Sequence, residues 1–256
     1  MIFSFILDVI QFFISILPYI LPFLWICAII VYSLKFFNST WDKFTRFGKL
    51  EEPSTWSHIP SLSNKFGWIS FYLFSCFMFF ISFFVRYPPA LANFLLFFHS
   101  FRRFFESVLL TKFSNRKMHI INLLAGLLFY CMAPITLAYC SANRSINNSY
   151  FYILILLATI LNYLQFDAHF ILASLKKYSI PRNWLFEKMT SPHYTIEIFL
   201  YFVYFLAAPH YLTFMMLIFV ILNLTHQSMM TYKWYINKFG QEFSSLHRYI
   251  LIPFLF

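Results

Sequence analysis

The sequence predicts an all-α integral membrane protein with about seven transmembrane helices. The chain is 61% hydrophobic and only 11% charged, whereas about 25% of the residues in a soluble domain are charged. The apolar residues are concentrated in runs of roughly 20, the length of helix that crosses the hydrocarbon core of a bilayer. Basic residues gather in alternate loops between these runs. Together these observations predict a helical bundle whose outer surface faces lipid.

Seven apolar segments are expected to cross the membrane. The first contains Pro18 and Pro22, which should bend or break it. The sixth is short and meets the seventh at Pro209-His210, so these two should form a tight hairpin; six spans are the alternative count. The predicted spans are Ile10–Leu34, Gly67–Val85, Ala90–Leu110, Ile120–Tyr139, Tyr150–Leu175, Thr195–Ala208 and Tyr211–Tyr232.

The N-terminal segment is expected to be retained as the first span. It has no basic residue before Lys35 and no small-residue cleavage pattern. Its apolar run is also too long for the hydrophobic region of a signal peptide.

The distribution of charge predicts the orientation of the chain. Four alternate loops hold 15 of the 19 basic residues, and the loops on the other side hold only Arg86 and Arg144. By the positive-inside rule, the C-terminus and the larger loops are cytosolic. The net charge of +10 has the same explanation, so no nucleic-acid partner is expected. Two glycosylation sequons, at Asn143 and Asn147, fall on the predicted lumenal side.

Composition excludes several familiar chemistries. With only four glycines the chain can form neither a GxGxxG motif nor a P-loop, so a nucleotide would have to be held by side chains inside the bundle. There is no HxxxH or HxxHH box, and we predict no metal site. There is no GxSxG motif, and the four cysteines lie in or beside apolar runs without CxxC spacing, which indicates small core residues. The charges are too localised at one end for a voltage sensor and do not favour a transporter.

The third predicted span contains a polar cluster. His99, Arg102, Arg103 and Glu106 fall within an arc of about 100° on a helix. An ionisable group inside a span costs about 2.5–3.5 kcal/mol, so this face must look into the bundle. The cluster is either a structural Arg–Glu pair or an arginine face directed at an anion.

More polar residues are expected at the same, cytosolic end of the bundle. His193 and Glu197 are four residues apart at the start of the sixth span, so they share one face. They either line a pocket or form an interfacial His with Glu197 paired to an arginine. The others are Gln165, His169 and Lys176 on one face of the fifth span, and Tyr232, Tyr235 and Arg248 in the tail.

A resemblance to a known family rests on three separated motifs: HSFRRFFE, the stretch QFDAHFILASLKKYSIPRNWLFEKMTSPHYTIEI, and the ending HRYILIPFLF. They resemble the steroid 5α-reductase superfamily, and the PHY form of SPHYTIE is most similar to its polyprenal/polyprenol reductase branch. The resemblance covers Phe98–Phe256, which predicts a C-terminal catalytic domain at 98–256 after N-terminal spans and a cytosolic loop at 1–97. It implies a seven-helix fold that binds NADPH in its cytosolic half.

The resemblance also implies the site residues. The cofactor-binding positions would be Arg103, Lys112, His169, Lys176, Tyr178, His193, Tyr235 and Arg248. Two departures leave the proton donor open among Glu106, Glu197 and Tyr72. The Gln-Glu pair of the steroid branch has no counterpart, and Lys65–Tyr72 matches the Trp-x-Ser-His-Phe-Tyr pattern of the polyprenal branch only loosely. A His that often precedes the tail Tyr is replaced by Thr231 and Tyr232.

The implied reaction is NADPH-dependent reduction of the α-isoprene double bond of polyprenal in the endoplasmic reticulum membrane, which would supply dolichol for protein N-glycosylation. A carbonyl is required, because an isolated allylic alcohol does not activate its double bond for hydride addition. The many Phe and Leu residues fit a groove for a long polyisoprenoid, and they fit lipid-facing surface equally well.

Three alternatives are left open. One is reduction of a steroid or an enoyl thioester within the same superfamily. Another is a methyltransferase for prenylated cysteine, which would need an Arg-His-Pro type motif that SPHY only partly matches. The last is a non-enzymatic lipid-binding or scaffold protein, which would show no NADPH-dependent activity.

Overall fold

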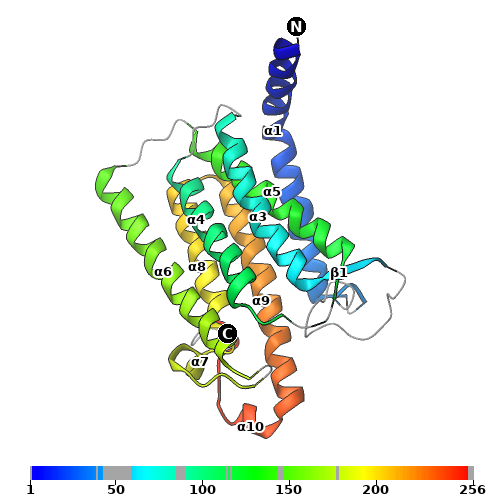
Figure 1. Cartoon of the computed structure of the whole chain (residues 1–256), viewed down its shortest axis with the longest axis vertical. Coiled ribbons are helices and arrows are strands. Elements are labelled where there is room, and N and C mark those ends of the chain that lie inside the picture. Colours follow the sequence, from blue (N-terminus) through cyan, green and yellow to red (C-terminus); the bar gives the residue numbers. More distant parts are fainter. Residues whose placement is uncertain are drawn as a thin grey trace.

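The computed structural model describes residues 2–38, 40–42, 59–84, 90–113, 115, 117–142, 147–176 and 179–252. Long helices pack side by side in one bundle, and the first turns of α1 project beyond it (Figure 1). The long helices are α1 (Ile2–Ser33), α3 (Asn64–Phe84), α4 (Leu91–Phe105), α5 (Ile120–Ser141), α6 (Asn148–Ser174), α8 (Pro192–Ala207) and α9 (Tyr211–Phe239). Shorter elements are a 3₁₀ turn (Leu34–Phe36), a π-helical turn (Glu106–Leu110), α7 (Trp184–Lys188) and α10 (Gln241–Ser244).

Each of the seven predicted spans falls on one of the seven long helices, and the α-helical membrane class is confirmed. Within the described residues, five segments are long and apolar enough to cross a bilayer: Ser15–Phe36, Asn64–Ser82, Ile120–Ser141, Asn148–Ser174 and Tyr211–Phe239. Helices α4 and α8 have 15 and 16 residues and are shorter than this. The number of spans and the cytosolic position of the C-terminus therefore stay predictions.

The helix α1 is not broken at its prolines. It is continuous through Pro18 and Pro22, so the predicted break is wrong. A proline removes one backbone hydrogen bond, and transmembrane helices tolerate this because neighbouring groups can satisfy the freed carbonyl.

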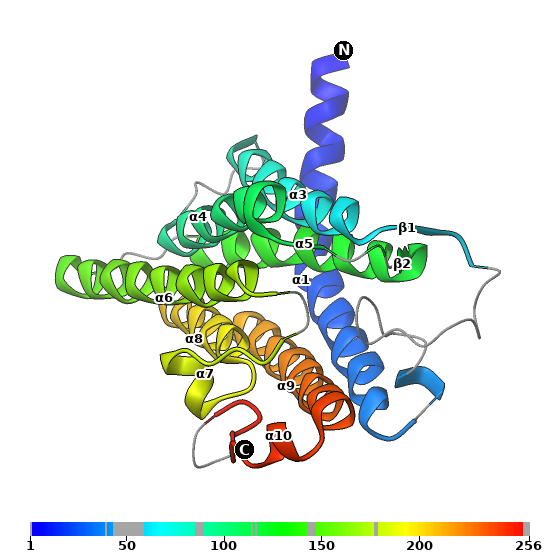
Figure 2. The ribbon, with the colours of Figure 1, turned by 60° about the horizontal axis from the view of Figure 1, so that its bottom comes forward.

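The structure also contains a small β-ribbon, which the prediction of an all-α fold did not include. Strands β1 (Ser61–Ser63) and β2 (Lys117–His119) pair antiparallel, with Leu62 opposite Met118. They precede α3 and α5 directly, so the ribbon holds the beginnings of these two helices side by side (Figure 2).

The hairpin between α8 and α9 is as tight as expected. Helix α8 ends at Ala207 and α9 begins at Tyr211. His210 closes a capping box, because its ring accepts from the first turn of α9 while Thr213 Oγ1 accepts the His210 backbone N–H at 3.1 Å. The three-residue connection therefore sets α8 and α9 antiparallel and in contact.

Helices α3 and α5 approach closely where Gly126 faces the ring of Phe71. A Cβ at Gly126 would lie 2.3 Å from Phe71 Cζ. That ring cannot retreat easily, since it stacks on Tyr130 with centroids 5.6 Å apart and meets Trp68 edge-on at 5.7 Å. The glycine is needed for this packing.

We expect Gly126→Ala to lower the free energy of unfolding by about 1–3 kcal/mol, the usual cost of overpacking. The control is Gly67→Ala, whose Cβ would meet the flexible end of Met118, with Sδ at 2.7 Å. Thermal unfolding in detergent measures both. Equal melting temperatures for the two variants would contradict the rigid contact with Phe71.

Candidate functional site

A cavity of about 460 Å³ lies at one end of the bundle. Seven of the described helices line it. Helices α1, α4, α6 and α9 contribute residues from their C-terminal parts, and helices α3, α5 and α8 contribute residues from their N-terminal parts. Successive long helices therefore run in opposite directions, and the cavity sits at the end that the charge distribution predicts to be cytosolic.

The residues that line the cavity change from apolar to polar along α9. At its deep end lie Phe219 and Val220, and at its outer end Thr231 and Tyr235. Sixteen residues of α-helix separate the extremes, which corresponds to about 24 Å. The deep part is completed by apolar and aromatic side chains from α3 and α5, and the outer part by polar side chains from α6, α8 and the segment after the π-helical turn. One end thus suits a hydrocarbon and the other a polar, anionic group.

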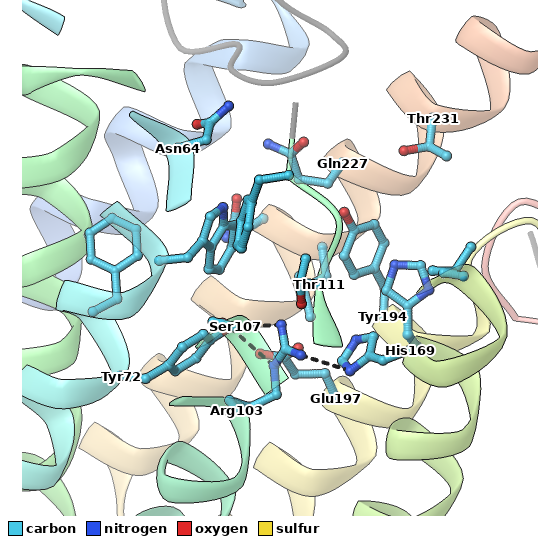
Figure 3. A pocket seen from close by; sticks show the side chains of 18 of the residues that line it. Asn64, Tyr72, Arg103, Ser107, Thr111, His169, Tyr194, Glu197, Gln227 and Thr231 are labelled. Carbon is cyan, nitrogen blue, oxygen red and sulfur yellow. Dashed lines mark hydrogen bonds between the residues drawn. The ribbon is translucent and has the colours of Figure 1, made fainter. Parts of the chain in front are cut away.

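Arg103 lies at the junction of these two parts, between Tyr72 and His169 (Figure 3). Its Nε and Nη2 atoms donate to the Tyr72 hydroxyl oxygen at 3.2 and 3.0 Å. Its Nη1 is 2.8 Å from His169 Nδ1, which is also 2.7 Å from Glu106 Oε2. This nitrogen accepts from Arg103 when the proton of the neutral ring is on Nε2, and it donates to Glu106 when Nδ1 itself carries a proton. The guanidinium fixes the Tyr72 hydroxyl inside the cavity.

Glu106 balances the charge of the arginines. Its carboxylate accepts hydrogen bonds from both Arg102 and Arg103, and its side chain is only 3% exposed. It begins the π-helical turn, whose Thr111 N–H donates to the Glu106 carbonyl at 2.8 Å. Glu106 does not line the cavity but lies behind the wall that Arg103 forms.

Glu197 has a different environment. It faces the cavity from α8 together with His193, as their four-residue spacing predicts. Its Oε2 atom accepts from Gln165 Nε2 at 3.0 Å, so the side chain is held by a neutral amide. The two buried carboxylates therefore differ in their hydrogen-bond donors, which are two guanidinium groups for Glu106 and a neutral amide for Glu197.

The structure brings together eight of the eleven sequence-predicted site residues. The residues that line the cavity are Tyr72, Arg103, Lys112, His169, Lys176, His193, Glu197 and Tyr235. Glu106 lies behind its wall, and Tyr178 falls outside the described residues. The catalytic and cofactor roles of all these residues stay predictions.

Arg248 does not line the cavity. Its Nη2 donates to the Pro181 carbonyl at 2.7 Å, and its guanidinium lies over the Phe243 ring. Burial lowers the pKa of this guanidinium, which still keeps its charge at neutral pH because arginine titrates so high.

Arg248 begins a segment that we call the C-terminal strap, residues 248–251. Tyr249 exchanges backbone hydrogen bonds with Lys188 and Thr190, both at 2.9 Å. Thr195 on α8 and Ser228 on α9 donate to the Leu251 and Ile250 carbonyls at 2.8 and 2.6 Å. The strap thus joins α7, α8 and α9 behind the polar part of the cavity.

Sequence reasoning missed several polar residues of the cavity wall. On α9, Asn223, Gln227 and Thr231 line the cavity. They precede the predicted Tyr235 at steps of four, so helical spacing could have identified them. Asn64 and Asn122 also line it, at the beginnings of α3 and α5, and only the contact between these helices reveals them.

Comparison with known families agrees with this geometry. The pattern described as 3-oxo-5-alpha-steroid 4-dehydrogenase matches residues 108–256, more than half of the chain. The chain belongs to this family. It is therefore an oxidoreductase by family, as the motifs in its C-terminal half led us to expect.

Individual relatives are named polyprenal reductase. The one from Saccharomyces cerevisiae is 29% identical over 247 residues, covering 89% of this chain and 95% of the relative. Those from Xenopus tropicalis and Homo sapiens are each 28% identical, over 65% and 63% of this chain. The chain spans 60% and 58% of the length of these two relatives. The predicted resemblance to the polyprenal reductase branch is confirmed.

We expect Glu106→Gln to lower the free energy of unfolding by about 3–5 kcal/mol, because it leaves buried cations without their counter-charge. The control is Glu242→Gln, which breaks the Arg182–Glu242 pair (3.0 Å, side chains 58% and 59% exposed). An exposed pair contributes at most about 1 kcal/mol. Denaturant unfolding in detergent measures both, and equal losses would contradict the charge-balancing role of Glu106.

Proposed function

We propose that this protein is a polyprenal reductase of the endoplasmic reticulum membrane. It would reduce the α-isoprene double bond of polyprenal with NADPH and so supply dolichol for protein N-glycosylation. The observation that supports this best is the cavity itself, polar at one end and apolar at the other, with a guanidinium-held tyrosine at the junction. The similarity to the yeast relative over nearly the whole of both chains points the same way.

The polar end fits a dinucleotide phosphate. Lys112 and Lys176 bring two cations to this part of the cavity, and such groups hold phosphates through charge-assisted hydrogen bonds. Asn64 Oδ1 and Asn122 Nδ2 are buried cavity-lining atoms without a partner among the described residues. Buried polar atoms of this kind are costly unless a ligand or water satisfies them. The donor set therefore suits NADPH.

The deep end fits the isoprenoid chain. Phe71, Phe129, Phe219 and Leu224 line it, and their side chains offer hydrocarbon and aromatic surface. An unsaturated lipid tail that comes from the bilayer fits such a surface through van der Waals contacts, because it leaves one hydrocarbon environment for another. The aldehyde at the end of that tail would then reach the junction where Tyr72 lies.

The chain supplies the electrostatics of the reaction. When bound, NADPH supplies a hydride to the β-carbon of the enal. The Tyr72 hydroxyl would donate its hydrogen bond to the carbonyl oxygen, where negative charge develops. Arg103, which donates to the same phenolic oxygen, would stabilise that charge without reorganising.

The surroundings of the two carboxylates separate their proposed roles. Glu106 accepts from Arg102 and Arg103 and lies outside the cavity, so we assign it to charge balance. Glu197 faces the cavity and accepts a hydrogen bond from an amide, so we assign it to orienting the bound reactants and to proton delivery at the α-carbon.

We expect Tyr72→Phe to lower kcat for NADPH-dependent reduction of polyprenal by about 10²–10⁴-fold, the usual contribution of a positioned acid. The α-saturated product, measured by mass spectrometry in membranes, reports the reaction. The control is Tyr150→Phe, which removes a hydroxyl bound to the Leu206 carbonyl at 3.1 Å on another part of the molecule.

The wild-type protein tests the function itself in the same assay. Saturation of a steroid enone or an enoyl thioester, but not of polyprenal, would overturn the substrate and keep the reaction class. Product formation without NADPH would overturn the cofactor. No reduction of any acceptor would favour a lipid-binding protein.

The lysines at the polar end are expected to act on cofactor binding. Lys112→Met or Lys176→Met should raise KM for NADPH about tenfold and change kcat little, because each removes a phosphate-binding charge from the wall. Lys238→Met is the matched control, since Lys238 lies 4.9 Å from the Trp234 ring outside the cavity. Steady-state kinetics with varied NADPH measures all three, and an unchanged KM in both test variants would contradict the phosphate site.

A further inference from the structure

A buried amide on α6, Gln165, connects three helices without reaching the cavity. It is 0% exposed and does not line the cavity wall. We infer that Gln165 is a positioning residue that holds the Glu197 carboxylate toward the cavity and keeps Arg102 away from it. This inference rests on the role proposed for Glu197 in the reaction.

Both N–H donors and the carbonyl oxygen of this amide have partners. Nε2 donates to Glu197 Oε2 at 3.0 Å and to the His193 carbonyl at 3.2 Å. Oε1 accepts from the Arg102 guanidinium. These partners fix the orientation of the amide, because a flipped side chain would turn its NH₂ group toward the guanidinium and its oxygen toward a carboxylate.

The amide acts as a neutral spacer between an arginine and a carboxylate. Arg102 also donates to Glu106 and, through Nε, to Asn162 Oδ1 at 3.1 Å. Without Gln165, Arg102 and Glu197 could pair directly, since Arg and carboxylate groups form strong bidentate contacts. Such a pair would draw Glu197 out of the cavity.

The amide also joins the carboxylate to the backbone that presents it. The His193 carbonyl lies in the first turn of α8, four residues before Glu197. One NH₂ group thus binds both the start of α8 and the side chain one turn later. The Oε1 atom of Glu197 is the carboxylate oxygen that this contact leaves for a ligand.

The test variant is Gln165→Met, which keeps the length of the side chain and removes its hydrogen bonds. Its matched control is Asn162→Leu on the same helix. Asn162 also binds Arg102, but its Nδ2 donates to the Ala158 carbonyl of its own helix at 2.8 Å. Both variants remove one partner of Arg102, and only Gln165→Met releases Glu197.

Activity is read through a double-mutant cycle with Glu197→Gln. We expect Gln165→Met to lower kcat about 10–100-fold, the usual effect of removing a supporting hydrogen bond behind a functional group. Asn162→Leu should stay within about threefold of the wild type. In the Glu197→Gln background, Gln165→Met should have no further effect, because its action passes through Glu197.

A second measurement needs neither cofactor nor acceptor, so it separates this inference from the proposed function. Labelling of Glu197 by a hydrophobic carbodiimide, quantified by peptide mass spectrometry, should fall several-fold in Gln165→Met and not in Asn162→Leu. If wild-type membranes reduce no acceptor, the proposed function fails while the labelling still tests Gln165. Equal labelling in Gln165→Met and the wild type, or independent effects in the cycle, would overturn the positioning role.

Discussion

The structure depends on one buried carboxylate that balances two arginines. Glu106 accepts from Arg102 and Arg103 in a part of the bundle where water does not reach it, with 3% of its side chain exposed. A cation left alone there would cost several kcal/mol. With Glu106 in place, Arg103 is free to present its remaining N–H groups to Tyr72, and Arg102 to present its own to Gln165 and Asn162. The carboxylate of Glu106 behind the cavity wall thus allows Arg103 to act as a hydrogen-bond donor to Tyr72, which lines the cavity.

Glu106 and Glu197 are buried carboxylates with different hydrogen-bond donors, one behind the cavity wall and one facing the cavity. Pairs of titratable groups in contrasting environments are how a single site separates its acid and base functions. Here the contrast is set by the second layer of side chains, two guanidinium groups in one case and an amide in the other. Along α9 the cavity is apolar at its deep end and polar at its outer end. A reactant with one apolar end and one polar end therefore fits into the cavity in only one orientation.

Helical period made much of this arrangement predictable. The spacing of His193 and Glu197 placed them on one face whatever surrounds them, and the arc of His99, Arg102, Arg103 and Glu106 required an inward-looking side. Helical period could not show that Glu106 lies behind the cavity wall, because its place depends on how α4 packs against α6, where Glu106 contacts His169. Lys112 was predicted as a cofactor-binding residue from the family resemblance and not from helical spacing. Arg248 could not be placed either, because its position depends on a contact with Pro181 that is distant in sequence.

The C-terminal strap has a consequence for how the protein is made. Tyr249 is bonded to Lys188 and Thr190, and Thr195 and Ser228 hold the next two carbonyls, so the strap supports α7, α8 and α9 through contacts with residues up to about sixty positions earlier in the chain. A nascent chain is inserted into the membrane helix by helix, and these contacts can form only after the strap has left the ribosome. Until then the beginning of α8, with His193 and Glu197, lacks its backing. Assembly of this part of the protein therefore follows the synthesis of all three helices that the strap joins, and the nascent chain passes through a stage in which these helices are inserted and the strap has not yet paired with them.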